Sequence, residues 1–172
     1  AEKDNSRLYN ESIILIGPSG AGKSTVAEEL RKITRMPRLS LDRIANQNRR
    51  SGYMKKFKNV EEHHIHMIKT ELERAKSYGK PGIVDFGAGH SVYDDPEKFN
   101  ELKKMLSKFK NIVLLLPSVD IKKSLEIMEK RSTGDTRDNK KFLTSLCNRE
   151  LATITIYGEG ITPNDIANEI VN

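Results

Sequence analysis

The chain has 172 residues, enough for one ordinary α/β domain with its own core and too few for two. Hydrophobic residues make up 36% of the chain and charged residues 31%, a balance that excludes a disordered polar chain. With 30 Lys and Arg against 24 Asp and Glu, the formal net charge is +6, which favours anionic partners without choosing among them. We expect a single domain over residues 1–172.

Other features of the composition concern location. No apolar run approaches the roughly 20 residues that cross a bilayer, so we expect no membrane partner. The first ten residues lack the apolar centre of a secretory signal. Cys147 has no second cysteine to pair with, so no intrachain disulfide can form. We therefore expect a cytoplasmic protein.

Short apolar runs alternate along the chain with amphipathic stretches, as in βα units around a parallel sheet. The expected strands are 12–16, 38–41, 83–86, 112–116 and 153–157. Helical spacing of apolar residues follows the first strand, covers about 60–78 and returns before and after the fourth strand. Thr162 and Pro163 open a last helix.

A glycine-rich motif lies between the first expected strand and the first long helix. It fits the pattern of glycine, four residues, then Gly-Lys-Ser, and reads Gly17, Pro18, Ser19, Gly20, Ala21, Gly22, Lys23, Ser24 and Thr25. The glycines let backbone N–H groups surround phosphates, and the helix N-terminus adds partial positive charge. With the strand pattern, the motif predicts a three-layer α/β/α P-loop NTPase fold with a five-stranded parallel sheet and a lid insertion.

The motif also predicts the cofactors, ATP and Mg²⁺. Lys23 is of the type that bridges the β- and γ-phosphates, and the Ser24 hydroxyl is placed to bind magnesium. No Asn-Lys-x-Asp signature for guanine is present, which favours ATP over GTP.

Two carboxylates follow expected strands on the same side as the glycine loop. Asp42, after the second strand, can orient an acceptor hydroxyl and accept its proton, or cap the next helix. Asp85 ends the third strand, where P-loop enzymes place a carboxylate that binds the metal; a buried structural role is the alternative.

Two polar segments are candidates for substrate contacts. Residues 130–142 are rich in Arg, Asp, Thr and Gly and predict a lid, in which Arg131 and Arg137 would stabilise charge on the transferring phosphoryl group. Residues 43–78 predict an acceptor-binding insertion. Most of its basic residues are expected on a solvated helical face.

The histidines are further candidates for a role in binding substrate or metal. His90 follows a glycine turn next to the expected pocket and is a candidate for contact with the substrate. His63, His64 and His66 lack the spacing and the companion ligands of a zinc site, so we expect surface histidines there.

Over nearly its whole length the chain resembles shikimate kinases and the related nucleoside-monophosphate kinase group. The resemblance rests on the glycine loop, on Asp42, on Gly87, Ala88 and Gly89 after the third strand, on the lid and on Leu151-Ala152-Thr153. It implies that Asp42 holds the hydroxyl to be phosphorylated, that residues 87–89 lie along the substrate and that lid arginines cover the phosphates.

The sequence differs from the shikimate kinase pattern at several positions. Ser40 stands where the family has a first acid, Ala88 interrupts the glycine triad, and Lys58 replaces an arginine for the substrate carboxylate. Arg recognises a carboxylate in bidentate fashion better than Lys does, so the acceptor is left open.

We therefore predict an ATP-dependent small-molecule kinase. A nucleoside or nucleotide kinase is the nearest alternative, and a P-loop ATPase that drives a partner is another. Nucleic acid is disfavoured as a partner because the basic residues are not interleaved with an aromatic platform.

Overall fold

The computed structural model describes residues 4–132 and 135–172. The strands are β1 (Ile13–Ile16), β2 (Arg38–Ser40), β3 (Ile83–Asp85), β4 (Asn111–Leu116) and β5 (Ile154–Tyr157). The helices are α1 (Ser6–Glu11), α2 (Lys23–Thr34), α3 (Leu41–Arg50), the 3₁₀ turn η1 (Tyr53–Lys56), α4 (Val60–Tyr78), α5 (Pro96–Leu106), α6 (Ile121–Arg131), α7 (Asn139–Thr144), α8 (Leu146–Leu151) and α9 (Pro163–Val171).

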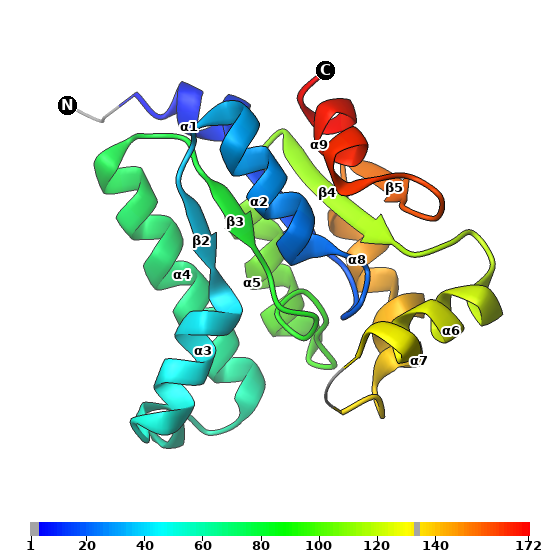
Figure 1. Ribbon diagram of the computed structural model, residues 1–172. Helices are drawn as coiled ribbons and strands as arrows, with labels where there is room; N and C mark the ends of the chain where they lie inside the picture. The colour runs from blue at the N-terminus through cyan, green and yellow to red at the C-terminus, as the bar shows by residue number, and fades with distance from the viewer. Residues whose placement is uncertain (1–3, 133–134) are drawn as a thin grey trace.

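The five strands form one parallel sheet in the order β2-β3-β1-β4-β5 (Figure 1). In register, Ile14 of the central strand pairs with Val84 of β3 and with Ile112 of β4. The predicted α/β fold with a five-stranded parallel sheet is confirmed, and each strand was placed to within one residue at either end. Because all strands run the same way, their carboxyl ends meet at one edge, where ligands bind in such sheets.

Each face of the sheet has its own apolar core. Successive strand side chains point to opposite faces, so Ile13 and Leu15 of β1 join the core under α2 and α9. Ile14 and Ile16 join the other core, which includes α4, α5 and α8. Both faces of the central strands are therefore covered, which explains why they read as continuous apolar runs.

Helix ends are fixed by capping groups at the edge of the sheet that carries the site. Ser40, the last residue of β2, caps α3 by accepting a hydrogen bond from the backbone N–H of Arg43 at 3.4 Å. Asp42 lies in the first turn of α3 and does not cap it. Thr162 caps α9, as predicted, by accepting from the N–H of Asp165 at 3.1 Å.

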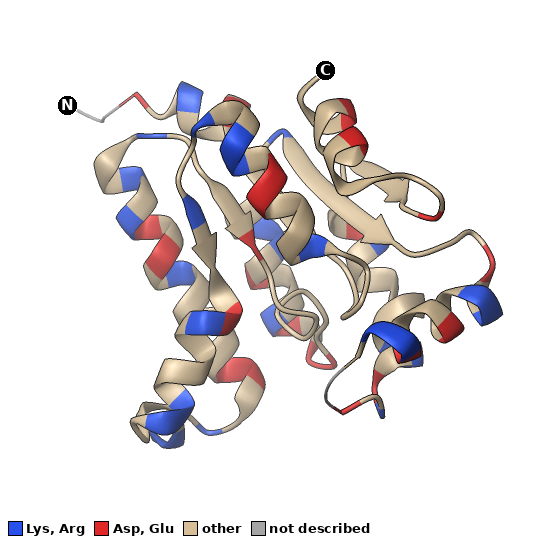
Figure 2. Cartoon of the chain, in the orientation of Figure 1, with Lys and Arg blue, Asp and Glu red and all other residues tan. Residues whose placement is uncertain are grey.

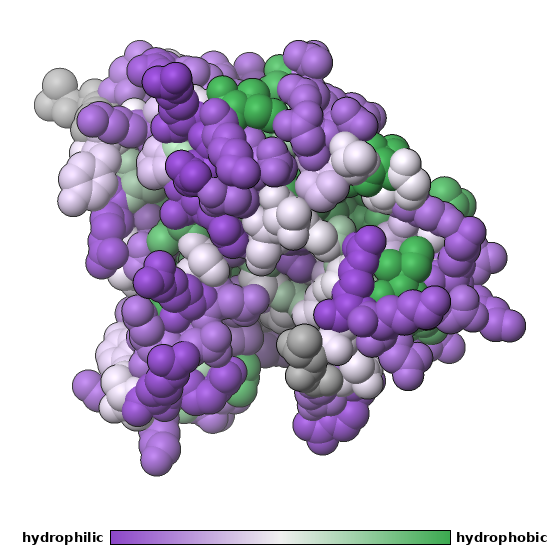
Figure 3. All heavy atoms as spheres, in the orientation of Figure 1, coloured by the Kyte–Doolittle hydropathy of each residue, from purple (hydrophilic) through white to green (hydrophobic). Residues whose placement is uncertain are grey.

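The predicted insertion forms α3, η1 and α4, and the predicted lid falls on the end of α6, the start of α7 and the segment between them. Residues 133 and 134 of that lid lie outside the described residues. Figure 3 shows a hollow between these two parts, which we call the cleft. None of the helices in the described part of the chain has the length and apolar character of a bilayer-crossing segment.

Candidate active site

The loop of residues 17–22 turns sharply between β1 and α2. Gly17 has a φ of 138°, and a Cβ on it would overlap the carbonyl oxygen of Leu115 in β4. Gly20 has a φ of 81°, and a Cβ there would lie 3.1 Å from the Cα of Met128. Both positions therefore require glycine. Because α2 begins directly after the loop, its free N–H groups and positive dipole end face whatever the loop encloses.

Lys23 is buried inside this loop. Its Nζ donates to the carbonyl oxygens of Gly17 at 2.7 Å and Pro18 at 2.9 Å. Burial lowers the pKa of Lys23, while the charges of Asp85 and Asp42 oppose the decrease. Both carboxylates predicted from the sequence thus act on the same ammonium group.

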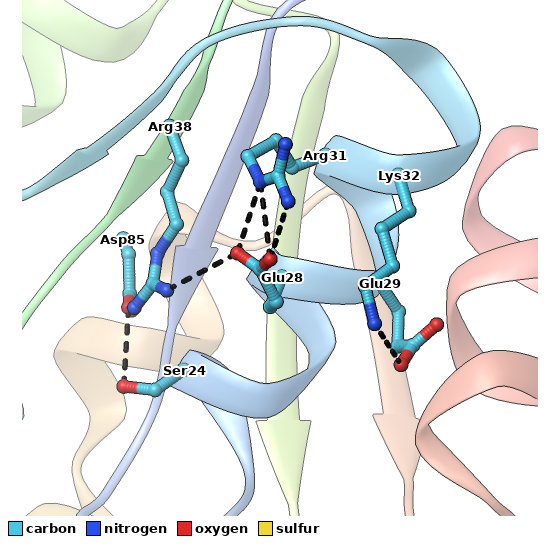
Figure 4. Close-up of polar contacts among 7 residues, drawn as sticks. All are labelled: Ser24, Glu28, Glu29, Arg31, Lys32, Arg38 and Asp85. Atoms are coloured by element: carbon cyan, nitrogen blue, oxygen red, sulfur yellow. Dashed lines mark hydrogen bonds and ion pairs between the residues drawn. The ribbon is translucent and has the colours of Figure 1, made fainter.

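Asp85, at the carboxyl end of β3, meets the start of α2 (Figure 4). Its Oδ2 accepts from the Ser24 hydroxyl at 3.3 Å and from Nη2 of Arg38 at 3.1 Å. Arg38 also pairs with Glu28 of α2 at 3.8 Å. Burial raises the pKa of Asp85, and the positive charges of Lys23 and Arg38 oppose that increase. The carboxylate therefore lies among cations and one hydroxyl, which suits a group that binds a metal or is held for structure.

Arg38 was not singled out from the sequence. It opens β2 opposite Ile83, and its side chain extends along the strand to Asp85. Its Nε is buried without a hydrogen-bond partner among the described residues. The available signal was an arginine at the start of a short strand, next to a strand that ends in an acid.

Asp42, in the first turn of α3, has 70% of its side chain exposed. Its carboxylate lies directly over Gly87, where a Cβ would overlap Oδ1. The loop after β3 therefore approaches α3 closely because residue 87 has no side chain. This contact brings Asp42 to the glycine turn; its role toward an acceptor hydroxyl stays a prediction.

His90 is turned toward protein groups, with only 3% of the residue exposed. Its Nδ1 accepts the backbone N–H of Gly87 at 2.8 Å. Burial lowers the pKa of His90 to about 3, assisted by the charge of Lys23, so the ring is neutral. The proton of the neutral ring is then on Nε2, which faces Oδ1 of Asp42 at 3.7 Å. His90 links the glycine turn to the carboxylate.

His64 of α4 forms the next layer behind the turn. Its ring meets that of His90 edge to face at 4.5 Å between centroids. Burial lowers the pKa of His64 to about 3, so this ring is also neutral. Within residues 4–132 and 135–172, no three His, Cys, Asp or Glu side chains are placed to hold a metal ion. His63 is buried and His66 exposed, so the expectation of surface histidines holds for only part of the cluster.

The two predicted lid arginines are placed differently. Arg131, the last residue of α6, donates from Nη1 to the carbonyl oxygen of Gly20 at 3.0 Å. Arg137 pairs with Asp135 at 2.6 Å, and 88% of its side chain is exposed. The structure thus brings Arg131 to the phosphate loop and leaves Arg137 at the surface.

Lys58 lies away from this group of residues. Its backbone N–H donates to Glu62 at 2.9 Å, and it lines a hollow between α4 and the start of α5. Four acids line the same hollow: Glu62, Asp95, Glu97 and Glu101. A role for Lys58 in substrate binding stays a prediction.

Known proteins resemble this chain over most of its length. Residues 13–145 match the family described as the AAA domain. A shikimate kinase from Enterococcus faecalis (strain ATCC 700802 / V583) is 28% identical over 169 residues, which are 94% of this chain and 96% of that protein.

Two solved structures illustrate the shared fold. The shikimate kinase from Acinetobacter baumannii in complex with shikimate has a TM-score of 0.63 at 20% identity, covering 96% of this chain and 92% of its own. A gluconokinase from Sinorhizobium meliloti 1021 has a TM-score of 0.59 at 16% identity, covering 95% and 90%. The resemblance to the shikimate kinase-like group that the sequence predicted is confirmed.

Proposed function

The chain belongs to the AAA domain family, and on that premise we propose that it is an ATP-dependent kinase. It transfers the γ-phosphoryl group of ATP to a hydroxyl group of a small molecule, in the cytoplasm. The kinases to which it is similar support this assignment. Membership of this family does not by itself say whether the phosphoryl group goes to an acceptor molecule or to water. That choice rests on the residues of the site.

The phosphate groups are bound by the loop of residues 17–22, whose backbone N–H groups and helix dipole attract anions. Lys23 and Arg131 add positive charge on two sides of this loop. Both cations now donate to carbonyl oxygens of the loop and would exchange these partners for phosphate oxygens, where they stabilise charge on the transferring group.

The residues present fit a magnesium ion. The Ser24 hydroxyl and the Asp85 carboxylate lie 3.3 Å apart, and both are oxygen ligands of the kind that magnesium prefers. Few protein ligands are needed, because nucleotide phosphates and water complete the coordination. When bound, magnesium would neutralise phosphate charge and orient the phosphates for transfer. Arg38 keeps the Asp85 carboxylate turned toward Ser24.

Asp42 is the group that we assign to the acceptor. Its carboxylate is exposed, its charge acts on Lys23, and it can orient a hydroxyl and accept its proton. His90 is a positioning residue, because its neutral ring joins the carboxylate to the backbone of Gly87. The proposal depends on this one observation: an exposed carboxylate lies over Gly87, and its charge and that of the buried Asp85 both act on the P-loop lysine.

The test is ADP release from magnesium-ATP in the presence of single acceptors. The panel contains shikimate, gluconate, other hydroxy acids, sugars, nucleosides and nucleotides. Stimulation by one class would establish the kinase and its acceptor. Steady hydrolysis that no compound changes would contradict the kinase and favour an ATPase that acts on a partner.

Two variants test the roles of the residues. Lys23→Ala should abolish transfer while the circular dichroism spectrum is unchanged. Asp42→Asn should reduce kcat about a hundredfold or more, within the range of general-base catalysis, without a similar loss of ATP affinity. Asp165→Asn is the matched control, since Asp165 is also exposed in the first turn of a helix and lies on α9. An equal effect of Asp42→Asn on turnover and on ATP binding would argue against its role.

A further inference from the structure

One segment of the predicted insertion carries positive charge alone. The segment 43–58 contains six cationic residues and no Asp or Glu: Arg43, Arg49, Arg50, Lys55, Lys56 and Lys58. All six are exposed, and none forms an ion pair with any residue that the structure describes. They lie at both ends of α3, in η1 and directly after it, where Figure 2 shows blue segments at the lower end of this part of the chain. We call these six residues the basic surface.

One member of the basic surface shares a helix face with Asp42. Residues four and seven positions apart lie above one another on a helix, which aligns Asp42, Asn46 and Arg49 along α3. The alignment agrees with a hydrogen bond from Nη1 of Arg49 to Oδ1 of Asn46 at 3.1 Å. Seven residues of helix span about 10 Å, so Arg49 lies two turns from the proposed reaction centre on the same side.

The side chains between the reaction centre and the basic surface do not cancel this charge. His64 and His90 are neutral. Of the acids at the start of α4, Glu61 accepts from the backbone N–H groups of residues 94 and 95. Glu62 accepts from the backbone N–H of Lys58, so one carboxylate lies at the edge of the six cations and does not balance them. An acceptor along α3 would therefore meet the Asp42 carboxylate and two neutral rings near its hydroxyl, and the cations of the basic surface further out.

We propose, on the basis of the function proposed above, that the acceptor is a phosphate ester. Its hydroxyl lies at Asp42 and its phosphate binds Arg49 within the basic surface. A phosphate monoester carries about −1.5 to −2 charges at neutral pH. An acceptor with a phosphate therefore matches a segment of several cations and no acid better than an acceptor with a single carboxylate does. The planar guanidinium of Arg49 can donate two parallel hydrogen bonds to phosphate oxygens.

Matched pairs of acceptors test this directly. ADP release is measured with glycerol and glycerol 3-phosphate, glucose and glucose 6-phosphate, and adenosine and AMP, together with a 5′-hydroxyl oligonucleotide. We expect turnover with a phosphorylated member and little with its phosphate-free partner. Turnover with the oligonucleotide alone would also support the phosphate contact and would identify nucleic acid as its source.

Arg49→Gln should raise the KM for the phosphorylated acceptor about tenfold or more, with kcat nearly unchanged, because the contact is remote from the reacting atoms. Lys104→Gln is the control, since it removes one positive charge from the exposed surface of α5. Equal turnover of both members of a pair, unaffected by Arg49→Gln, would overturn the inference and leave the kinase intact.

A binding measurement separates the two proposals. Calorimetric titration of AMP and of glucose 6-phosphate is carried out with the magnesium complex of a non-hydrolysable ATP analogue at saturation, so that the P-loop is filled. If either compound binds and Arg49→Gln weakens the binding, the phosphate site is supported. This holds even if no acceptor stimulates ADP release, because the lack of stimulation would refute only the kinase. If neither compound binds and acceptors without a phosphate group are turned over, the phosphate site is refuted.

Discussion

Replacement of His90 by asparagine should make the stability of the protein less sensitive to acid. His90 is neutral in the folded protein because burial lowers its pKa to about 3. In the unfolded chain its pKa is about 6.5. Between these two values the unfolded state binds more protons than the folded state, so stability falls as the pH decreases below 6.5 toward 3.

The size of this effect follows from the difference between the two pKa values. At pH 5 the solution is about 1.5 pH units below the pKa of the histidine in the unfolded chain but still above its pKa in the folded protein. Protonation therefore stabilises only the unfolded state, by about 1.36 kcal/mol for each of these pH units. The wild-type protein should therefore lose about 2 kcal/mol more than His90→Asn between pH 7 and pH 5. Asn can still accept the N–H of Gly87 through its side-chain oxygen.

Urea unfolding at pH 7, 6 and 5 measures the difference for each variant. With a slope of about 2 kcal/mol per molar urea, the midpoint of the wild type should shift by about 1 M more than that of His90→Asn. Other titrating groups, such as Asp85, are shared and cancel in the comparison. His66→Asn is the control, since His66 is exposed on α4, and it should behave as the wild type does. If the urea midpoints of the wild type and of His90→Asn depend on pH in the same way, the conclusion that the His90 ring is buried and neutral is refuted.

Two further substitutions test the geometry of the site. Gly87→Ala should lower kcat about tenfold or more while the KM for ATP is retained, because its Cβ would displace the Asp42 carboxylate and lie 2.6 Å from Cε1 of His90. Gly89→Ala is its control, since its Cβ would make only ordinary contacts at 3.7 Å or more, and equal losses in the two would count against the argument. Arg38→Gln should raise the magnesium concentration needed for half-maximal activity several-fold, as measured by titration at saturating ATP, because the buried Asp85 would lose its cationic partner. If the magnesium concentration for half-maximal activity is unchanged, Arg38 has no role in metal binding.

Local sequence patterns determined much of the fold and the phosphate loop. The strands are short apolar runs, and α4 has the predicted limits, 60–78, because Asn59 caps its start and Gly79 its end. The P-loop was found because its chemistry depends on consecutive residues: glycines that allow the turn, then a lysine and a hydroxyl at the start of a helix.

The acceptor side of the site depends on contacts between distant segments. Asp42 was identified from its place after a strand, but its contact with Gly87 and His90 arises only when the loop after β3 packs against α3. The same holds for Arg38, whose partner Asp85 is 47 residues away in the chain.

The sequence by itself determined the five strands and the longer helices between them, the glycine-rich loop and the two candidate carboxylates. Only the tertiary structure decided that Arg131 rather than Arg137 reaches the loop, and that His90 is buried and neutral. The physical reason is range: periodicity and caps act over a few residues, whereas burial and pairing of charges depend on neighbours that the fold alone supplies.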